Sequence, residues 1–118
     1  MNSQILEAFK NEVSAYKANS AKGGNLEIAW YHLERAHILG QFSALLHLQV
    51  HFYMIIHALK AKDFAELLGQ VPRFILAVPG SIFRLAPVGN PGGTSVGIFQ
   101  PVEIPHDLKA ILMKSDSN

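Results

Sequence analysis

The chain reads LEIAWYHLERAHILGQFSALLHLQVHFYMIIHALKA between residues 26 and 61. Apolar residues recur every three or four positions on both sides of Gly40, which is typical of two amphipathic helices. Gly40 is suited to the C-terminal cap of the first helix, and so short a connection makes the two helices antiparallel. The pattern therefore predicts a helical hairpin. Its first helix is capped by Asn25 and runs to about Leu39, and its second continues to about Ala61.

Two further helices flank this hairpin. Apolar spacing between Ile5 and Tyr16 predicts an amphipathic helix that ends near Asn19. Asp63 and Glu66 have the spacing of a capping box, so a fourth helix should begin there. The predicted fold class is mainly all-α, with two antiparallel helical hairpins in a tetratricopeptide-like or four-helix arrangement.

The fourth helix contains Pro72, which removes a backbone hydrogen bond and should kink or end the helix. Residues 71–77 could then form a separate, tilted turn. Regular helix should stop after residue 78, because five of the six prolines and five of the nine glycines lie in residues 79–105.

Residues 79–105 are nevertheless too apolar for a disordered tail, so they should pack over the helices as an extended arm. A short hairpin around residues 89–93 is one reading of the glycines there, and residues 105–113 resemble a last short helix. We interpret residues 1–118 as one domain, with a helical body in residues 1–78 and a packed arm and short helix in residues 79–118.

Composition excludes several classes of function. Ten basic and nine acidic residues give a net charge of +1 without long charged blocks, which argues against binding to nucleic acid or an anionic membrane surface. The chain has no cysteine, so thiolate catalysis and cysteine zinc sites are excluded, and a reducing cytoplasm is the expected location. The most apolar stretch, residues 42–59, is interrupted by histidines and glutamine, and we interpret it as a buried helix and not as a membrane span.

Carboxylates and histidines gather on the central hairpin. On helical geometry the first helix places three of them in one column beside its apolar stripe, namely Glu27, Glu34 and His37. His47 and His51 lie one turn apart on the second helix. If the hairpin folds back at Gly40, Glu34 should face His47, and residues 27–30 should lie near His51.

This pattern predicts a metal site. Two imidazoles one turn apart, opposite a Glu-x-x-His step, supply the ligands that bind zinc, iron, manganese, nickel or copper in a helical bundle. We predict four ligands, Glu34, His37, His47 and His51, with Glu27 as a fifth ligand or a support for the others. An open coordination position could activate water for catalysis, but no substrate and no definite enzyme class follows from the sequence.

Two alternatives remain open. The chain could be a repeat-like protein-interaction module whose groove binds a protein partner, with a structural Glu/His hydrogen-bond network and no metal. It could also form a homo-oligomer through its apolar helices or the arm. The glycine-rich residues 89–93 could present backbone amides to an anion, but a tight turn is the better interpretation.

The run His-Leu-Glu-Arg-Ala-His-x-Leu-Gly-Gln in residues 32–41, with His47, His51 and the glycine-rich loop, resembles the bacterial Domain of Unknown Function 3703 family. The resemblance implies a small bacterial helical protein without an established activity. It marks Glu34, His37, His47 and His51 as motif positions only. Pro91 departs from the family's loop pattern, which weakens an anion-binding role for the loop.

Overall fold

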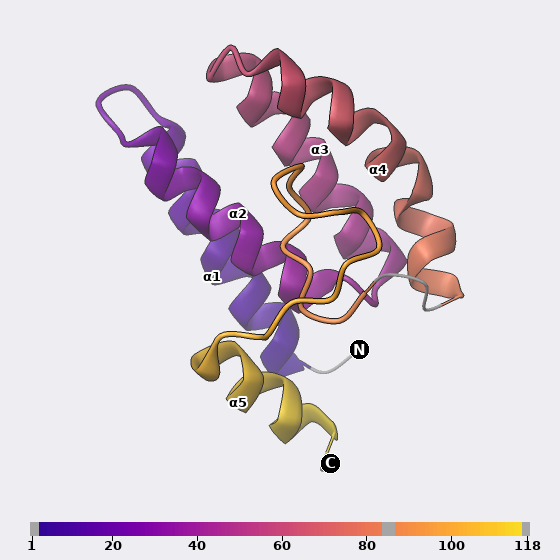
Figure 1. The fold of residues 1–118 in the computed structure, drawn as a ribbon. Coiled ribbons are helices and arrows are strands. Elements are labelled where there is room, and N and C mark those ends of the chain that lie inside the picture. Colours follow the sequence, from indigo (N-terminus) through magenta and orange to yellow (C-terminus); the bar gives the residue numbers. More distant parts are fainter. Residues whose placement is uncertain (1–2, 84–86, 117–118) are drawn as a thin grey trace.

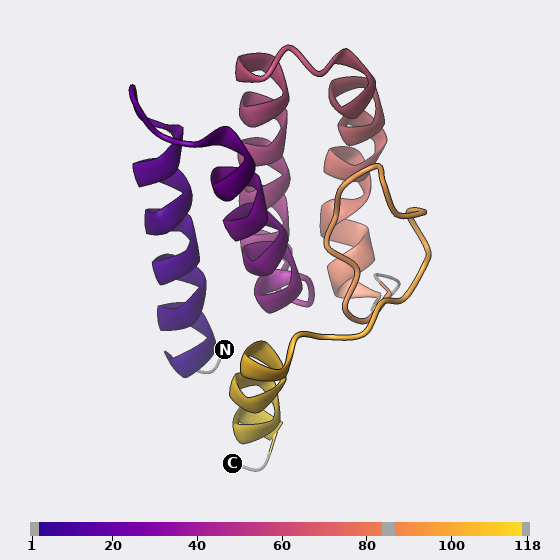
Figure 2. The ribbon, with the colours of Figure 1, turned by 60° about the vertical axis from the view of Figure 1, so that its left-hand side comes forward.

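The computed structural model describes residues 3–83 and 87–116. These residues form five α-helices and no strand (Figure 1): α1 (Ser3–Ser20), α2 (Leu26–Gly40), α3 (Ala44–Lys60), α4 (Phe64–Ile82) and α5 (His106–Asp116). Helix α1 packs along α2, and α3 packs along α4. Helix α2 also contacts α3, while the short α5 packs against α1 and α2 (Figure 2). The predicted all-α fold with helical hairpins is thus confirmed.

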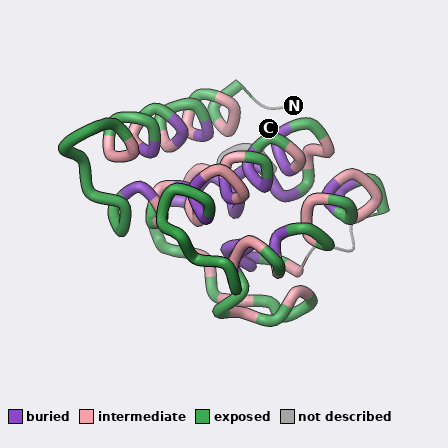
Figure 3. Tube along the Cα trace, turned by 90° about the horizontal axis from the view of Figure 1, so that it is seen from above, coloured by how far each residue is buried: buried purple, intermediate pink, exposed green. Residues whose placement is uncertain are grey.

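The core lies between α1, α2 and α3, whose inward faces carry most of the buried residues (Figure 3). Its largest fully buried apolar side chains are Phe9, Leu33, Met54 and Leu108. Burial of a side chain of this size contributes about 1.5–3 kcal/mol, so the inward apolar stripes hold the three helices together.

The predicted helix starts are confirmed. Asn25 caps α2 by accepting hydrogen bonds from the backbone N–H groups of Glu27 and Ile28. Asp63 caps α4 by accepting from the N–H of Glu66 at 3.0 Å. These side chains satisfy amide groups that the first turn of a helix leaves without partners.

Gly40 has a different role from the one predicted. It is the last residue of α2, and the C-cap is Gln41 in right-handed helical conformation. A Cβ atom on Gly40 would lie 2.9 Å from Cβ of Leu46 and 3.0 Å from Cε2 of Phe9. Glycine is therefore needed for close approach of α1 and α3 to the end of α2, and not for a left-handed cap.

The predicted end of the fourth helix was wrong. Helix α4 continues through both Pro72 and Pro79 to Ile82, and it follows a curved path (Figure 1). Pro72 is exposed, and so is Leu68 one turn earlier, whose carbonyl loses its helical partner. Water can satisfy that carbonyl, and helix curvature relieves the clash with the proline ring.

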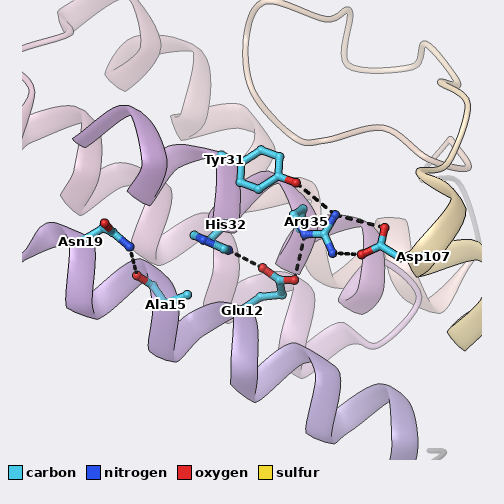
Figure 4. Close-up of polar contacts among 7 residues, drawn as sticks. All are labelled: Glu12, Ala15, Asn19, Tyr31, His32, Arg35 and Asp107. Carbon is cyan, nitrogen blue, oxygen red and sulfur yellow. Dashed lines mark hydrogen bonds and ion pairs between the residues drawn. The ribbon is translucent and has the colours of Figure 1, made fainter. Parts of the chain in front are cut away.

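A polar link connects α1, α2 and α5 (Figure 4). Glu12 on α1 accepts a hydrogen bond from Nε of Arg35 at 2.8 Å and pairs with Nδ1 of His32 at 2.6 Å. Arg35 also forms an ion pair with Asp107 on α5. His32 therefore joins helices and lies away from the predicted site.

Residues 87–105 pack as an irregular arm across α2, α3 and α4 (Figure 1). Residues 89–93 are all buried, and the side-chain amide of Asn90 donates to the carbonyls of Gly97 and Gln100. The packed arm is confirmed. The predicted hairpin around residues 89–93 is not confirmed, because the described part of the arm contains no strand. The N–H of Val102 nevertheless donates a hydrogen bond to the carbonyl of Val88.

Candidate metal centre

Three histidines converge in the interior. His37 comes from α2, and His47 and His51 come from α3. Their Nε2 atoms lie 3.0 Å (His37 to His47), 3.0 Å (His37 to His51) and 3.1 Å (His47 to His51) apart. Each residue is buried, with an exposed fraction of 5% or less. Among the described residues, these three form a group whose ligand atoms are close enough to share one metal ion.

The opposite ring nitrogen of each histidine has its own hydrogen-bond partner. Nδ1 of His37 lies 2.6 Å from the backbone oxygen of Asn90. Nδ1 of His47 lies 2.9 Å from Oγ of Ser81, and Nδ1 of His51 lies 2.7 Å from Oε1 of Gln70. The arm and α4 therefore fix the orientation of all three rings.

These partners determine where the ring protons are. The Asn90 oxygen is a carbonyl and can only accept. The Ser81 hydroxyl uses its single proton to donate to the carbonyl of Gln41 at 2.7 Å, so it must accept from His47. The Gln70 amide nitrogen donates to the carbonyl of Gly92 and to Glu66, which leaves Oε1 facing His51 as an acceptor. Each Nδ1 is therefore the donor and carries a hydrogen.

A neutral imidazole has one N–H, so the three Nε2 atoms that face one another carry lone pairs and no proton. Additional protons are disfavoured, because burial lowers the pKa of His47 to about 4 and that of His51 to about 3. Burial also holds the pKa of His37 well below its ordinary value. The centre of the cluster thus presents three hydrogen-bond acceptors without a donor.

The glycine-rich turn is shaped to cover His37. Gly92 has φ +91°, and a Cβ atom there would lie 2.5 Å from Cδ2 of the His37 ring. A Cβ on Gly93 would lie 2.8 Å from Cζ2 of Trp30. Glycine at these positions lets the backbone rest directly on the two rings, so the turn forms a tight cover over the cluster.

The structure does not bring the predicted glutamates into this group. Glu27 is exposed and borders a separate cavity beside His57. Glu34 is half-buried, and its pKa is raised by burial and then by the charge of Glu66. The contacts between α2 and α3 are shifted by about one helical turn from the predicted pairing of Glu34 with His47. The shift arises because residues 41–43 form a short non-helical connection before α3 begins. Trp30 consequently faces His57, with ring centroids 5.2 Å apart.

A cavity of about 120 Å³ adjoins the cluster. The three imidazoles line it together with Arg73, and in the part of the chain that the structure describes no carboxylate does so. Apolar side chains form much of the remaining wall: Leu76, Pro79, Pro87, Ile98 and Phe99. A metal held by the histidines would therefore adjoin space large enough for a small ligand.

The sequence-based prediction missed the residues that orient the rings. Gln70 and Ser81 lie three turns apart on α4 and share its buried face with Ala77. Two uncharged polar residues at this spacing on a largely apolar helix were a detectable signal. Asn90 acts through its backbone oxygen, which no side-chain pattern could indicate.

The fold and the site together define an all-α protein with a buried cluster of three histidines. The chain belongs to the family described as "Protein of unknown function (DUF3703)", whose family model matches residues 3–112. Neither the curated proteins nor the solved structures gave a significant match. In the part of the chain that the structure describes, no helix combines the length and apolar character needed to cross a membrane.

Proposed function

We propose that this protein binds one transition-metal ion through the Nε2 atoms of His37, His47 and His51. The observation that carries the proposal is the convergence of three unprotonated nitrogens within 3.1 Å, with each Nδ1 hydrogen already donated elsewhere. Lone pairs at this distance repel one another, and a cation between them turns the repulsion into bonding. Donation of the other ring N–H to a carbonyl or side chain is the usual support for a metal-bound histidine.

Three imidazole ligands suit zinc, copper, iron and nickel. Catalytic zinc sites commonly use three protein ligands and leave one position for water or substrate. Bond lengths of about 2.0–2.1 Å place the nitrogens of a tetrahedral zinc site about 3.3 Å apart, so the rings would need to separate by only a few tenths of an ångström.

An ion at this position would adjoin the cavity that the three histidines line. Bound zinc lowers the pKa of a coordinated water to about 7, which supplies hydroxide near neutral pH. We therefore propose metal-assisted attack of water on a small substrate as the reaction class, with the histidines as ligands. Asn90, Ser81 and Gln70 would act as positioning residues.

The alternative of a metal-free structural network receives less support. A closed hydrogen-bond network needs a donor for each acceptor, and the inner edges of the three rings supply only acceptors. The cytoplasmic location stays a prediction from the sequence.

Titration of the metal-free protein with zinc and with cobalt tests the proposal. We expect one ion per chain, a raised melting temperature that chelator reverses, and a loss of affinity of at least a hundredfold in His47→Ala and His51→Ala. His106→Ala is the matched control because this exposed histidine lies outside the cluster. Circular dichroism checks that each variant is folded. Unchanged stoichiometry in both site variants, or no binding by the unaltered chain, would contradict the proposal.

A further inference from the structure

Arg73 carries an unneutralised positive charge at the edge of the cavity. Its Nη1 donates to the carbonyl of Gly69 at 2.9 Å, and its Nη2 donates to the carbonyl of Val96 at 3.1 Å. Both acceptors are neutral. Within the described residues, the ion pairs involve Arg35 and His32, and none involves Arg73.

This charge acts directly on the cluster. Arg73 lines the same cavity as the histidines, and its charge adds a smaller effect to burial, which is the main cause of the lowered pKa of His37 and of His51. A guanidinium group has five N–H donors, so donors remain after the two backbone contacts. No aspartate or glutamate among the described residues lines the cavity, and three neutral imidazoles leave the charge of a divalent ion uncompensated. The loaded site would therefore be strongly positive and would attract an anion.

The walls restrict the kind of anion. Leu76, Pro79, Ile98 and Phe99 offer no hydrogen bonds to the several oxygens of phosphate or sulfate. Apolar walls instead favour a ligand that hides hydrocarbon from water. The cavity of about 120 Å³ is slightly smaller than cavities of about 150 Å³ that bind benzene. A single charge joined to a small hydrocarbon body fits both constraints.

We infer that the cavity binds a small monocarboxylate with an apolar body, and that Arg73 holds the carboxylate beside the metal site. This inference rests on the proposed metal-binding function, because the carboxylate would partly neutralise the combined positive charge of the metal and Arg73. The hydrocarbon part lies against the apolar wall. Arginine is well suited to this role, since its planar fork matches the two oxygens of a carboxylate.

The test uses full-length protein loaded with cobalt, whose visible spectrum reports ligands at the metal. Butyrate and benzoate are compared with butyramide and benzamide, which match them in shape and lack the charge. We expect each carboxylate to bind at least tenfold more tightly than its amide. Inorganic phosphate should bind more weakly than either carboxylate.

Arg73→Gln should remove most of the preference for carboxylate over amide while cobalt stoichiometry stays at one per chain. Arg73→Lys, which keeps the charge, should retain part of the preference. Lys10→Gln is the control because Lys10 is an exposed cation on α1. If Arg73→Gln does not fold, the lysine variant and the carboxylate-to-amide ratio of the unaltered protein decide the matter.

Failure of cobalt to bind would refute the proposed function itself. Stoichiometric cobalt with equal affinity for carboxylate and amide would refute only the inference about the ligand. A carboxylate preference that survives in Arg73→Gln would remove Arg73 from the binding site, and tighter binding of phosphate would refute the apolar-bodied ligand.

Discussion

Gly92 lies where the arm meets the histidine cluster, and its lack of a side chain should be essential for the site. An alanine Cβ there would lie 2.5 Å from Cδ2 and 2.9 Å from Nε2 of His37, so the turn or the ring must move. We expect Gly92→Ala to lower zinc affinity at least tenfold, because His37 loses its position against the other two rings. Calorimetric zinc titration measures this change.

Gly23 provides a matched control for the backbone effect. It also has positive φ, +85°, but nothing lies within 4 Å of the position of its Cβ. Gly23→Ala should therefore show only the conformational penalty, about 1–2 kcal/mol of unfolding free energy, with unchanged zinc affinity. Gly92→Ala should lose at least about 1 kcal/mol more, from the contact with His37. Equal behaviour of the two variants in both measurements would show that the close contact is unimportant.

The convergence of the histidines could be predicted from the sequence, whereas the positions of the glutamates could not. His47 and His51 share a helix, and one-turn spacing alone places them on one face. The position of Glu34 depends instead on the register between α2 and α3. Residues 41–43 shift that register by about one turn, and their conformation depends on the tight contact of Gly40 with Phe9 and Leu46. Helical periodicity contains no information about such a contact.

Helix α4 illustrates the same limit for a whole element. Its start followed from the Asp63 cap, whereas its continuation past Pro72 depends on which side of the helix faces solvent. The buried residues of α4 are Gln70, Ala77 and Ser81. This helix turns a small and polar face toward the histidines and its large apolar side chains toward solvent.

Six of the exposed apolar side chains of α3 and α4 recur every seven residues. They are Leu45, Phe52 and Leu59 on α3, and Leu68, Ile75 and Ile82 on α4, each at least 50% exposed. Residues equally distant from the turn of an antiparallel hairpin lie level with one another, so the two rows form three level pairs. A seven-residue repeat is the pattern with which helices pack against other helices, and a self-complementary face favours a symmetric dimer.

We expect this protein to form a homodimer through the outer face of α3 and α4. Replacing Phe52 or Ile75 with lysine should raise the dissociation constant at least tenfold, because a charge in an apolar contact loses its hydration. Sedimentation velocity over a range of concentrations measures the change. Ile28→Lys is the control, since Ile28 is similarly exposed on α2. A monomer at every concentration would refute the expectation.

The histidine cluster also couples the stability of the whole molecule to pH. In the folded, metal-free protein, burial lowers the pKa of His47 to about 4 and of His51 to about 3, and that of His37 lies well below 6.5. The unfolded chain returns each imidazole to a pKa near 6.5, so below that pH it binds more protons than the folded state. Stability is therefore fully present above pH 6.5 and is lost as the pH falls toward 4.

The expected loss of unfolding free energy at low pH is large. One proton difference changes the free energy of unfolding by about 1.4 kcal/mol per pH unit, so three histidines together approach about 4 kcal/mol per unit below pH 6. A small domain has about 5–15 kcal/mol in total, so the metal-free protein should lose a large part of its stability as the pH falls from about 6 to about 4. Urea unfolding at a series of pH values measures the slope.

Variants identify which groups produce this slope. His51→Leu removes one buried imidazole and should flatten the slope by about a third, and His106→Asn is the control because this exposed histidine lies outside the cluster. His57 contributes in the same direction, since burial lowers its pKa as well.

Zinc at about a thousand times its dissociation constant should add about 4 kcal/mol to the free energy of unfolding at pH 7 and progressively less at lower pH, because protons compete for the same Nε2 atoms. A free energy of unfolding that is equal at pH 7 and pH 5 in the absence of metal would show that the three imidazoles are not buried in their neutral form.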